Sequence, residues 1–98
     1  MDRDDVLKQL REHEPELRSL GVLRLSLFGS MARDEARADS DVDLLAVFDE
    51  ARHLSLLDLL SIERRIAGWV GRPVDLLEEG QLKQRVAAAV EAELVRAF

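Results

Sequence analysis

The spacing of a glycine–serine pair and three aspartates constrains this sequence more than any other feature. Gly29 and Ser30 are followed, after ten further residues, by Asp41 and Asp43, and Asp75 stands alone much later. Alternate residues of a strand point to the same side, so Asp41 and Asp43 share one face. Aspartate is depleted in strands, yet this pair begins an apolar run. The pattern indicates a turn that faces a phosphate, beside carboxylates able to bind divalent metal ions.

Hydrophobic periodicity predicts helices and strands that alternate along the chain. Apolar residues recur at helical spacing from residue 6 to residue 20, with a break expected at Pro15 and an end at Gly21. Residues 23–28 alternate and are predicted as the first strand. A short helical piece at residues 29–33, a polar loop at 35–40 and a second strand at 41–48 are expected to follow.

The second half of the chain predicts two further helices around a third strand. Residues 54–69 form an amphipathic pattern that ends near Gly68 and Gly71, and residues 73–77 read as a short strand. Residues 81–98 predict an alanine-rich closing helix. The inner sides of these two helices are expected to carry Leu56, Leu59, Leu60 and Ile66 in the first, and Leu82, Val86, Val90 and Leu94 in the second.

The predicted order is αβαβαβα, and the aspartates constrain how the strands pair. If Ser30, Asp41 and Asp43 are to meet, the first strand must end where the second begins, which makes that pair antiparallel. Asp75 then requires the third strand to start beside the second, in a parallel pair with a right-handed crossover. The predicted fold class is α/β (α+β): a small mixed three-stranded sheet with helices packed on it, in a single domain spanning residues 1–98.

Composition narrows the classes of function. A chain of 98 residues suffices for one core, and we expect it to lack a second substrate-binding domain. Its 47% hydrophobic content argues against disorder. A net charge of −6 disfavours direct nucleic-acid binding by the chain alone and suits a basic partner. With no cysteine, no signal-peptide pattern and no apolar run of membrane-spanning length, the expected location is the cytoplasm.

Two segments carry a family resemblance. Residues 27–33, LFGSMAR, and residues 40–45, SDVDLL, resemble the signature of the DNA polymerase beta-type nucleotidyltransferases. More narrowly, nearly the whole chain resembles the minimal nucleotidyltransferase antitoxins that are paired with HEPN-domain toxins. The resemblance implies the nucleotidyltransferase fold. One departure is Asp34, where many relatives have glycine, so the backbone there is less free to approach a phosphate.

The resemblance also implies a role for each residue of the pattern. Gly29 would let the triphosphate of ATP approach the backbone, and Ser30 would donate to it. Asp41 and Asp43 would share two Mg²⁺ ions, with Mn²⁺ as an alternative metal. Asp75 would bind the second metal and accept the proton of the acceptor hydroxyl.

Each of these residues also has a purely structural interpretation. A glycine–serine pair after a strand is often only a turn. Asp41 suits an Asx turn, while Asp43 and Asp75 suit exposed edge positions. Arg33 lies one helical turn after Ser30, where it would either reach a phosphate or stay on the surface. Three other residues are interpreted as structural: His13 and His53 as surface residues, and Trp69 as a packing residue.

Three functions are compatible with this pattern. The favoured one, implied by the resemblance, is an antitoxin that transfers AMP from ATP to a tyrosine hydroxyl of a cognate HEPN ribonuclease toxin. The second is an antitoxin that neutralises the toxin by binding alone, which Asp34 favours. The third is a small-molecule nucleotidyltransferase, which the expected lack of an acceptor domain disfavours.

Overall fold

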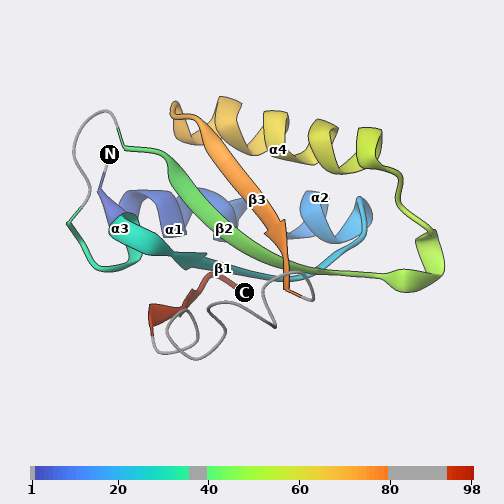
Figure 1. Cartoon of the computed structure of the whole chain (residues 1–98), viewed down its shortest axis with the longest axis horizontal. Helices are drawn as coiled ribbons and strands as arrows, with labels where there is room; N and C mark the ends of the chain where they lie inside the picture. Colours follow the sequence, from blue (N-terminus) through green and yellow to red (C-terminus); the bar gives the residue numbers. More distant parts are fainter. Residues whose placement is uncertain (1, 36–39, 80–92) are drawn as a thin grey trace.

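A computed structural model describes residues 2–35, 40–79 and 93–98 (Figure 1). Helices alternate with strands through most of the chain, as the periodicity predicted. The helices and strands are α1 (Arg3–Glu12), α2 (Glu14–Ser19), β1 (Val22–Phe28), α3 (Gly29–Ala32), β2 (Val42–Phe48), the 3-10 turn η1 (Glu50–Arg52), α4 (Leu56–Val70), β3 (Val74–Glu78) and β4 (Val95–Arg96).

The strands form one mixed sheet in the order β3-β2-β1-β4. β1 and β2 are antiparallel, with Phe28 opposite Asp43. β2 and β3 are parallel, with Asp43 beside Asp75. Both pairings confirm the predicted directions. The predicted number of strands was too small, because β4 adds a fourth strand antiparallel to β1.

β4 also corrects the prediction of a closing helix over residues 81–98. Val95 and Arg96 pair with β1 instead of continuing a helix. The side chain of Arg11 fixes this segment from α1: its Nε donates to the carbonyl of Ala97 at 2.9 Å, and its Nη2 donates to the carbonyl of Arg96 at 3.1 Å. The strand therefore satisfies one edge of β1. The predicted inner positions Leu82, Val86 and Val90 lie outside the described residues, and Leu94 lies directly before β4.

The hydrophobic core lies between one face of the sheet and the helices α1, α2 and α4. Alternation in β2 sends every second side chain into it. The core residues include Val6, Leu7 and Leu10 of α1, Leu17 of α2, Leu25 and Leu27 of β1, Val42, Leu44 and Ala46 of β2, and Ile62, Ile66 and Val70 of α4. The opposite face of β2 therefore carries Asp43.

The buried side of α4 differs from the prediction. Leu56 and Leu60 were expected inside, but their exposed fractions are 72% and 39%. Ile62, Ile66 and Val70 form the buried line instead. Leu60 precedes Ile62 by two positions, which at about 3.6 residues per turn puts the two side chains on opposite sides of the helix. Leu56 is the first residue of α4. Leu59 is half-buried, and Ile66 is buried as predicted.

Local signals account for where the helices begin and end. Pro15 lies in the first turn of α2, and the break between α1 and α2 falls at His13. Ser55 and Asp58 form a capping box at the start of α4, and Gly71 ends it in the left-handed conformation at φ +68°. In the stretches that the structure describes, no helix is long and apolar enough to cross a membrane.

Candidate active site

The sheet register brings the ends of three strands into one row. Phe28, the last residue of β1, lies opposite Asp43, which lies beside Asp75. Asp43 is the second residue of β2 and Asp75 the second of β3, so both stand near the start of their strands. Asp41 directly precedes β2 and is exposed. The predicted aspartates thus gather at the end of the sheet where α3 lies (Figure 1).

Gly29 packs directly against the carboxylate of Asp43. Its φ is +74°, a conformation that L side chains rarely adopt. A Cβ at this position would collide with Asp43 Oδ2 and lie 3.3 Å from Asp43 Cγ. Backbone conformation and close contact therefore both require glycine here, a structural role that the sequence did not reveal. The two parts of the sequence pattern are in physical contact.

Asp43 is the electrostatic centre of the cluster. Its side chain is half-buried, and this burial raises the pKa of the carboxyl above its ordinary value. The negative charges of Asp75 and Asp41 raise the pKa further, while the positive charge of Arg33 opposes them. The charges of Asp41 and Asp75, which are both exposed, therefore act on the ionisation of Asp43.

The donor set fits hard divalent cations by its chemistry. Carboxylate oxygens are the ligands that Mg²⁺ prefers, and a cation would offset the repulsion that raises the pKa of Asp43. Within the described residues, however, no group of three His, Cys, Asp or Glu side chains is arranged to hold an ion. The carboxylates therefore suit the metal by their chemistry, but their side chains do not point to one common position.

The short helix α3 ends in a hydrogen-bonded motif that explains the departure at Asp34. The N–H of Asp34 donates to the carbonyl of Met31 at 3.1 Å, and the N–H of Glu35 donates to the carbonyl of Ser30 at 2.9 Å. This is the Schellman pattern, whose left-handed position usually carries glycine. Asp34 occupies it at φ +59°. Glycine therefore suits this position for a backbone reason, apart from any phosphate.

Arg33 is engaged by two carboxylates. Its Nε donates to Glu35 Oε2 at 3.2 Å, and its Nη1 donates to Glu93 Oε2 at 2.9 Å. The hydrogen bonds to Glu35 and then Glu93 raise the pKa of the exposed guanidinium. Sequence reasoning missed Glu93, which follows Arg33 by sixty positions and offers no local signal.

The structure confirms the predicted settings of Trp69 and His53 and contradicts that of His13. Ser30 is half-buried in α3, directly after Gly29. His13 was interpreted as a surface residue, but it is partly buried: its ring stacks on Trp69 with centroids 3.8 Å apart, and its Nδ1 lies 2.8 Å from the Gln9 carbonyl. Trp69 thus packs as predicted, and His53 is exposed as predicted.

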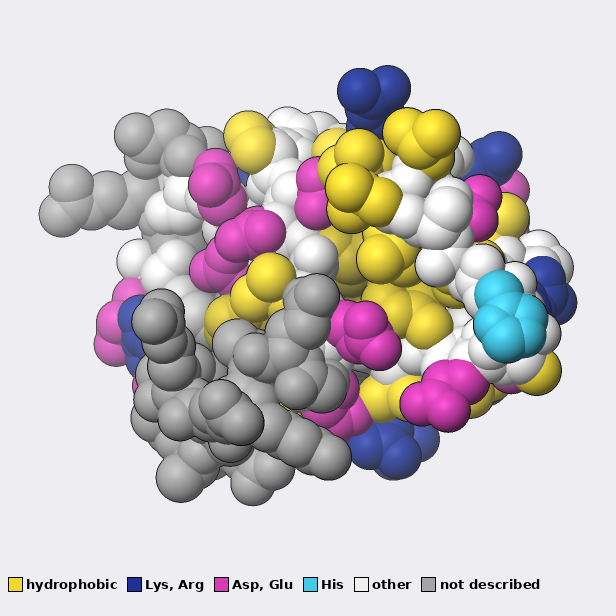
Figure 2. Space-filling view, turned by 45° about the vertical axis from the view of Figure 1, so that its right-hand side comes forward, with side chains coloured by type: hydrophobic (Ala, Val, Ile, Leu, Met, Phe, Trp, Pro, Cys, Tyr) yellow, Lys and Arg dark blue, Asp and Glu magenta, His cyan; other side chains and the backbone are white. Residues whose placement is uncertain are grey.

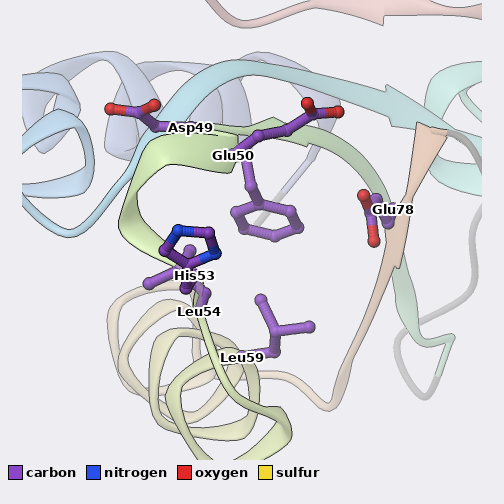
Figure 3. A pocket seen from close by; sticks show the side chains of 7 residues that line it. Asp49, Glu50, His53, Leu54, Leu59 and Glu78 are labelled. Carbon is purple, nitrogen blue, oxygen red and sulfur yellow. The ribbon is translucent and has the colours of Figure 1, made fainter.

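A hollow of about 200 Å³ lies at the other end of β2 and β3 (Figure 3). Phe48 and Glu78, the last residues of these strands, line it together with Leu54 and Leu59. None of the predicted site residues lines this hollow. The carboxylate cluster and the hollow are therefore distinct features at opposite ends of the sheet.

Comparison with known proteins identifies the family. Residues 7–96 match the family model of the nucleotidyltransferase domain. The protein adenylyltransferase MntA of Thermococcus cleftensis is 38% identical over 93 residues, which cover 94% of this chain and 92% of that protein.

Solved structures agree. A candidate minimal nucleotidyltransferase superposes with a TM-score of 0.78 at 38% identity, covering 97% of this chain and 95% of the other. A toxin–antitoxin crystal structure with AMP-PNP shares the fold, with a TM-score of 0.66 at 20% identity, covering all of this chain and 73% of the other. The sheet, the family match and the near full-length relatives together show that this chain belongs to the nucleotidyltransferase domain family and is a minimal nucleotidyltransferase enzyme.

Proposed function

We propose that this enzyme is an antitoxin that transfers AMP from ATP to a tyrosine hydroxyl of a cognate HEPN ribonuclease toxin, in the cytoplasm. The observation that carries the proposal is the row Phe28–Asp43–Asp75, which puts the glycine turn and the carboxylates at one end of the sheet. The relative MntA is named a protein adenylyltransferase, and a structure that shares the fold is a toxin–antitoxin complex with AMP-PNP.

Each residue of the cluster has a proposed task. The Gly29 turn receives the triphosphate, and the hydroxyl of Ser30 donates a hydrogen bond to it. Asp41, Asp43 and Asp75 are the proposed ligands of two Mg²⁺ ions, for which Mn²⁺ is a plausible substitute. When bound, these ions supply positive charge that stabilises the transferring phosphoryl group and the leaving pyrophosphate.

Asp75 is the proposed proton acceptor because it is exposed beside the half-buried Asp43. The acceptor oxygen of the tyrosine forms a bond to the α-phosphorus of ATP. The bond from that phosphorus to the bridging oxygen breaks, and pyrophosphate leaves. The hydroxyl proton passes to the carboxylate of Asp75. The product is a tyrosine carrying AMP, which blocks the ribonuclease.

Arg33 remains a proposed phosphate ligand. Its positive charge opposes the rise in the pKa of Asp43, so this charge acts at the cluster. Its present partners are Glu35 and Glu93, both carboxylates. A triphosphate offers the same kind of oxygen with more negative charge, so we propose that Arg33 exchanges one carboxylate for a phosphate when ATP binds.

The same ion pairs favour a second candidate, an antitoxin that only masks its toxin. With Arg33 held by Glu35 and Glu93, and with the carboxylates not converged on an ion, the described conformation is not prepared for transfer. In this case the separated toxin would carry no AMP. It would also regain ribonuclease activity once this protein is removed.

The decisive experiment incubates the protein with the toxin, Mg²⁺ and labelled ATP. We expect label on toxin tyrosine, and we expect the double variant Asp41→Asn with Asp43→Asn to lose at least about a hundredfold in rate. Asp4→Asn, an exposed change in α1, is the matched control and should transfer normally. Undiminished transfer by the double variant would rule out the proposed carboxylates, and an unmodified toxin that recovers activity would establish masking instead.

A further inference from the structure

The first two turns of α4 expose leucines to solvent. The exposed fractions are 72% for Leu56, 77% for Leu57 and 39% for Leu60. Figure 2 shows hydrophobic side chains gathered on this side of the molecule. Single exposed leucines are common, but a contiguous group of them marks an interaction surface.

These leucines adjoin the hollow at the far end of the sheet. Leu54 and Leu59 line that hollow on the side of α4, with Phe48 of β2 (Figure 3). Leu54, Leu56, Leu57, Leu59 and Leu60 are therefore called the leucine strip. It runs from the hollow across the exposed side of α4, and it combines a concave part with a protruding part.

The two sides of the leucine strip carry opposite charges. On the side of the hollow, Asp49, Glu50 and Glu78 stand around the apolar lining (Figure 3). Asp49 is partly neutralised by Arg52, with 3.9 Å between the charged atoms. Glu50 and Glu78 are exposed, and neither forms an ion pair with another described residue.

On the other side, Leu57 and Leu60 line a shallow depression together with Arg64 and Arg65. Arg65 lies 3.8 Å from Glu16, whereas Arg64 has no ion-pair partner among the described residues. This is a basic edge on a protein whose net charge is −6.

We infer that the leucine strip is the interface of a symmetric homodimer of this chain. A two-fold axis through the strip brings the acidic side of one copy over the basic side of the other, twice. The patch is therefore complementary to itself in charge, while its leucines supply the apolar centre. Because the strip lies at the end of the sheet opposite Asp43 and Asp75, both carboxylate clusters stay accessible in the dimer.

Sedimentation velocity of the full chain, from low to high micromolar concentration, tests the inference. We expect a reversible monomer–dimer equilibrium. Leu57→Ser should weaken it by about tenfold or more, because each substitution is present twice in the dimer. Leu23→Ser is the matched control, since Leu23 is an exposed leucine of β1 outside the strip, at 45% exposure. Melting temperatures verify that both variants are folded.

Charge reversal tests the proposed symmetry. Arg64→Glu alone, or Glu50→Arg with Glu78→Arg, should weaken the dimer, and combining all three changes should restore it. A wild-type chain that stays monomeric throughout would overturn the inference, as would equal effects of Leu23→Ser and Leu57→Ser, or a triple variant that does not recover.

The outcome does not depend on the proposed function. A monomeric Leu57→Ser variant that still transfers AMP supports a dimer surface separate from the active site. If the wild type is monomeric and Leu57→Ser prevents toxin binding, the strip is a toxin contact and the homodimer is excluded.

Discussion

Gly29 combines two requirements, a left-handed backbone and a close contact, which do not occur together at Gly71 or Gly68. At Gly71, φ is +68° but a Cβ would meet no atom within 4 Å, and at Gly68 there is neither a positive φ nor a contact. At Gly29, the left-handed backbone and the Asp43 carboxylate both oppose a side chain. These three positions therefore separate backbone strain from steric collision.

Alanine at each of the three glycines gives a graded prediction. Gly68→Ala in the interior of α4 should stabilise the fold by up to about 1 kcal/mol. Gly71→Ala should cost about 1–2 kcal/mol through its positive φ alone. Gly29→Ala should cost more than Gly71→Ala and should also reduce AMP transfer by displacing Asp43. Urea unfolding gives the order, and equal costs at Gly29 and Gly71 would contradict the collision.

Because the pKa of Asp43 is raised in the folded protein, the direction in which this residue changes the free energy of unfolding with pH is determined. The folded carboxyl has a pKa above the ordinary 3.8, so its charged form destabilises the native state at neutral pH. Below the unfolded pKa both states are protonated, and this penalty disappears.

We therefore expect Asp43→Asn to raise the melting temperature at pH 7. Because the group is partly exposed and screened by solvent, the gain in free energy should stay below about 1 kcal/mol. It should shrink as the pH falls through the folded pKa toward 3.8 and be absent near pH 3. Parallel thermal melts with Asp4→Asn as control measure it, and a gain that grows on acidification would refute the assignment.

Among the described α-helices, α3 is the shortest, with four residues, and its stability depends on how it ends. Asp34 supplies the left-handed residue of its Schellman motif at φ +59°. Aspartate tolerates this conformation better than most L residues, and glycine tolerates it best. We expect Asp34→Gly to be the most stable variant, by about 0.5–1 kcal/mol, and Asp34→Ala to be the least stable. Urea unfolding of the three proteins checks the order, and an alanine variant as stable as wild type would contradict it.

β4 depends on Arg11 of α1 for its position beside β1. The two hydrogen bonds from this guanidinium to the carbonyls of Ala97 and Arg96 are charge-assisted. We expect Arg11→Ala to cost about 1–2 kcal/mol and to speed amide exchange at Ala97, whose N–H donates to the Leu25 carbonyl. Lys8→Ala, another exposed cation of α1, is the control. Unchanged exchange at Ala97 would show that the strand is held by pairing alone.

The sequence predicted those elements whose periodicity extends over several residues. β1, β2, β3 and α4 each repeat long enough to be recognised, and the aspartate spacing gave the correct strand directions. A two-residue strand such as β4 has no measurable period, so the sequence pattern predicts the end of a helix there instead. Two contacts at the candidate site were not predicted. Glu93 lies far from Arg33 in sequence. The close packing of Gly29 on Asp43 depends on the exact register of β1 on β2, which the predicted strand directions leave open.

For the whole molecule, binding of metal and nucleotide should appear as stability. The three proposed ligands are aspartates gathered at one end of the sheet, in a chain whose net charge is −6. A ligand that binds only the native state stabilises it by RT ln(1 + [L]/Kd), about 2.7 kcal/mol at a hundredfold excess over Kd. We expect Mg²⁺ to raise the melting temperature of the wild type and Mg²⁺ with ATP to raise it further.

The double variant Asp41→Asn with Asp43→Asn should show neither increase, while Asp4→Asn should show both. A wild-type melting curve that ignores millimolar Mg²⁺ and ATP would argue against the proposed site and favour toxin binding without catalysis.

The parallel pairing of β2 with β3 also determines the stage of folding at which the carboxylates meet. Phe28 and Asp43 are close in sequence, so β1 and β2 can associate early. Asp75 reaches Asp43 only after the chain has passed through the whole of α4, and such distant contacts form slowly. A growing or partly folded chain thus has the glycine turn before it has the third carboxylate. The proposed metal site would therefore be completed only when β3 joins the sheet.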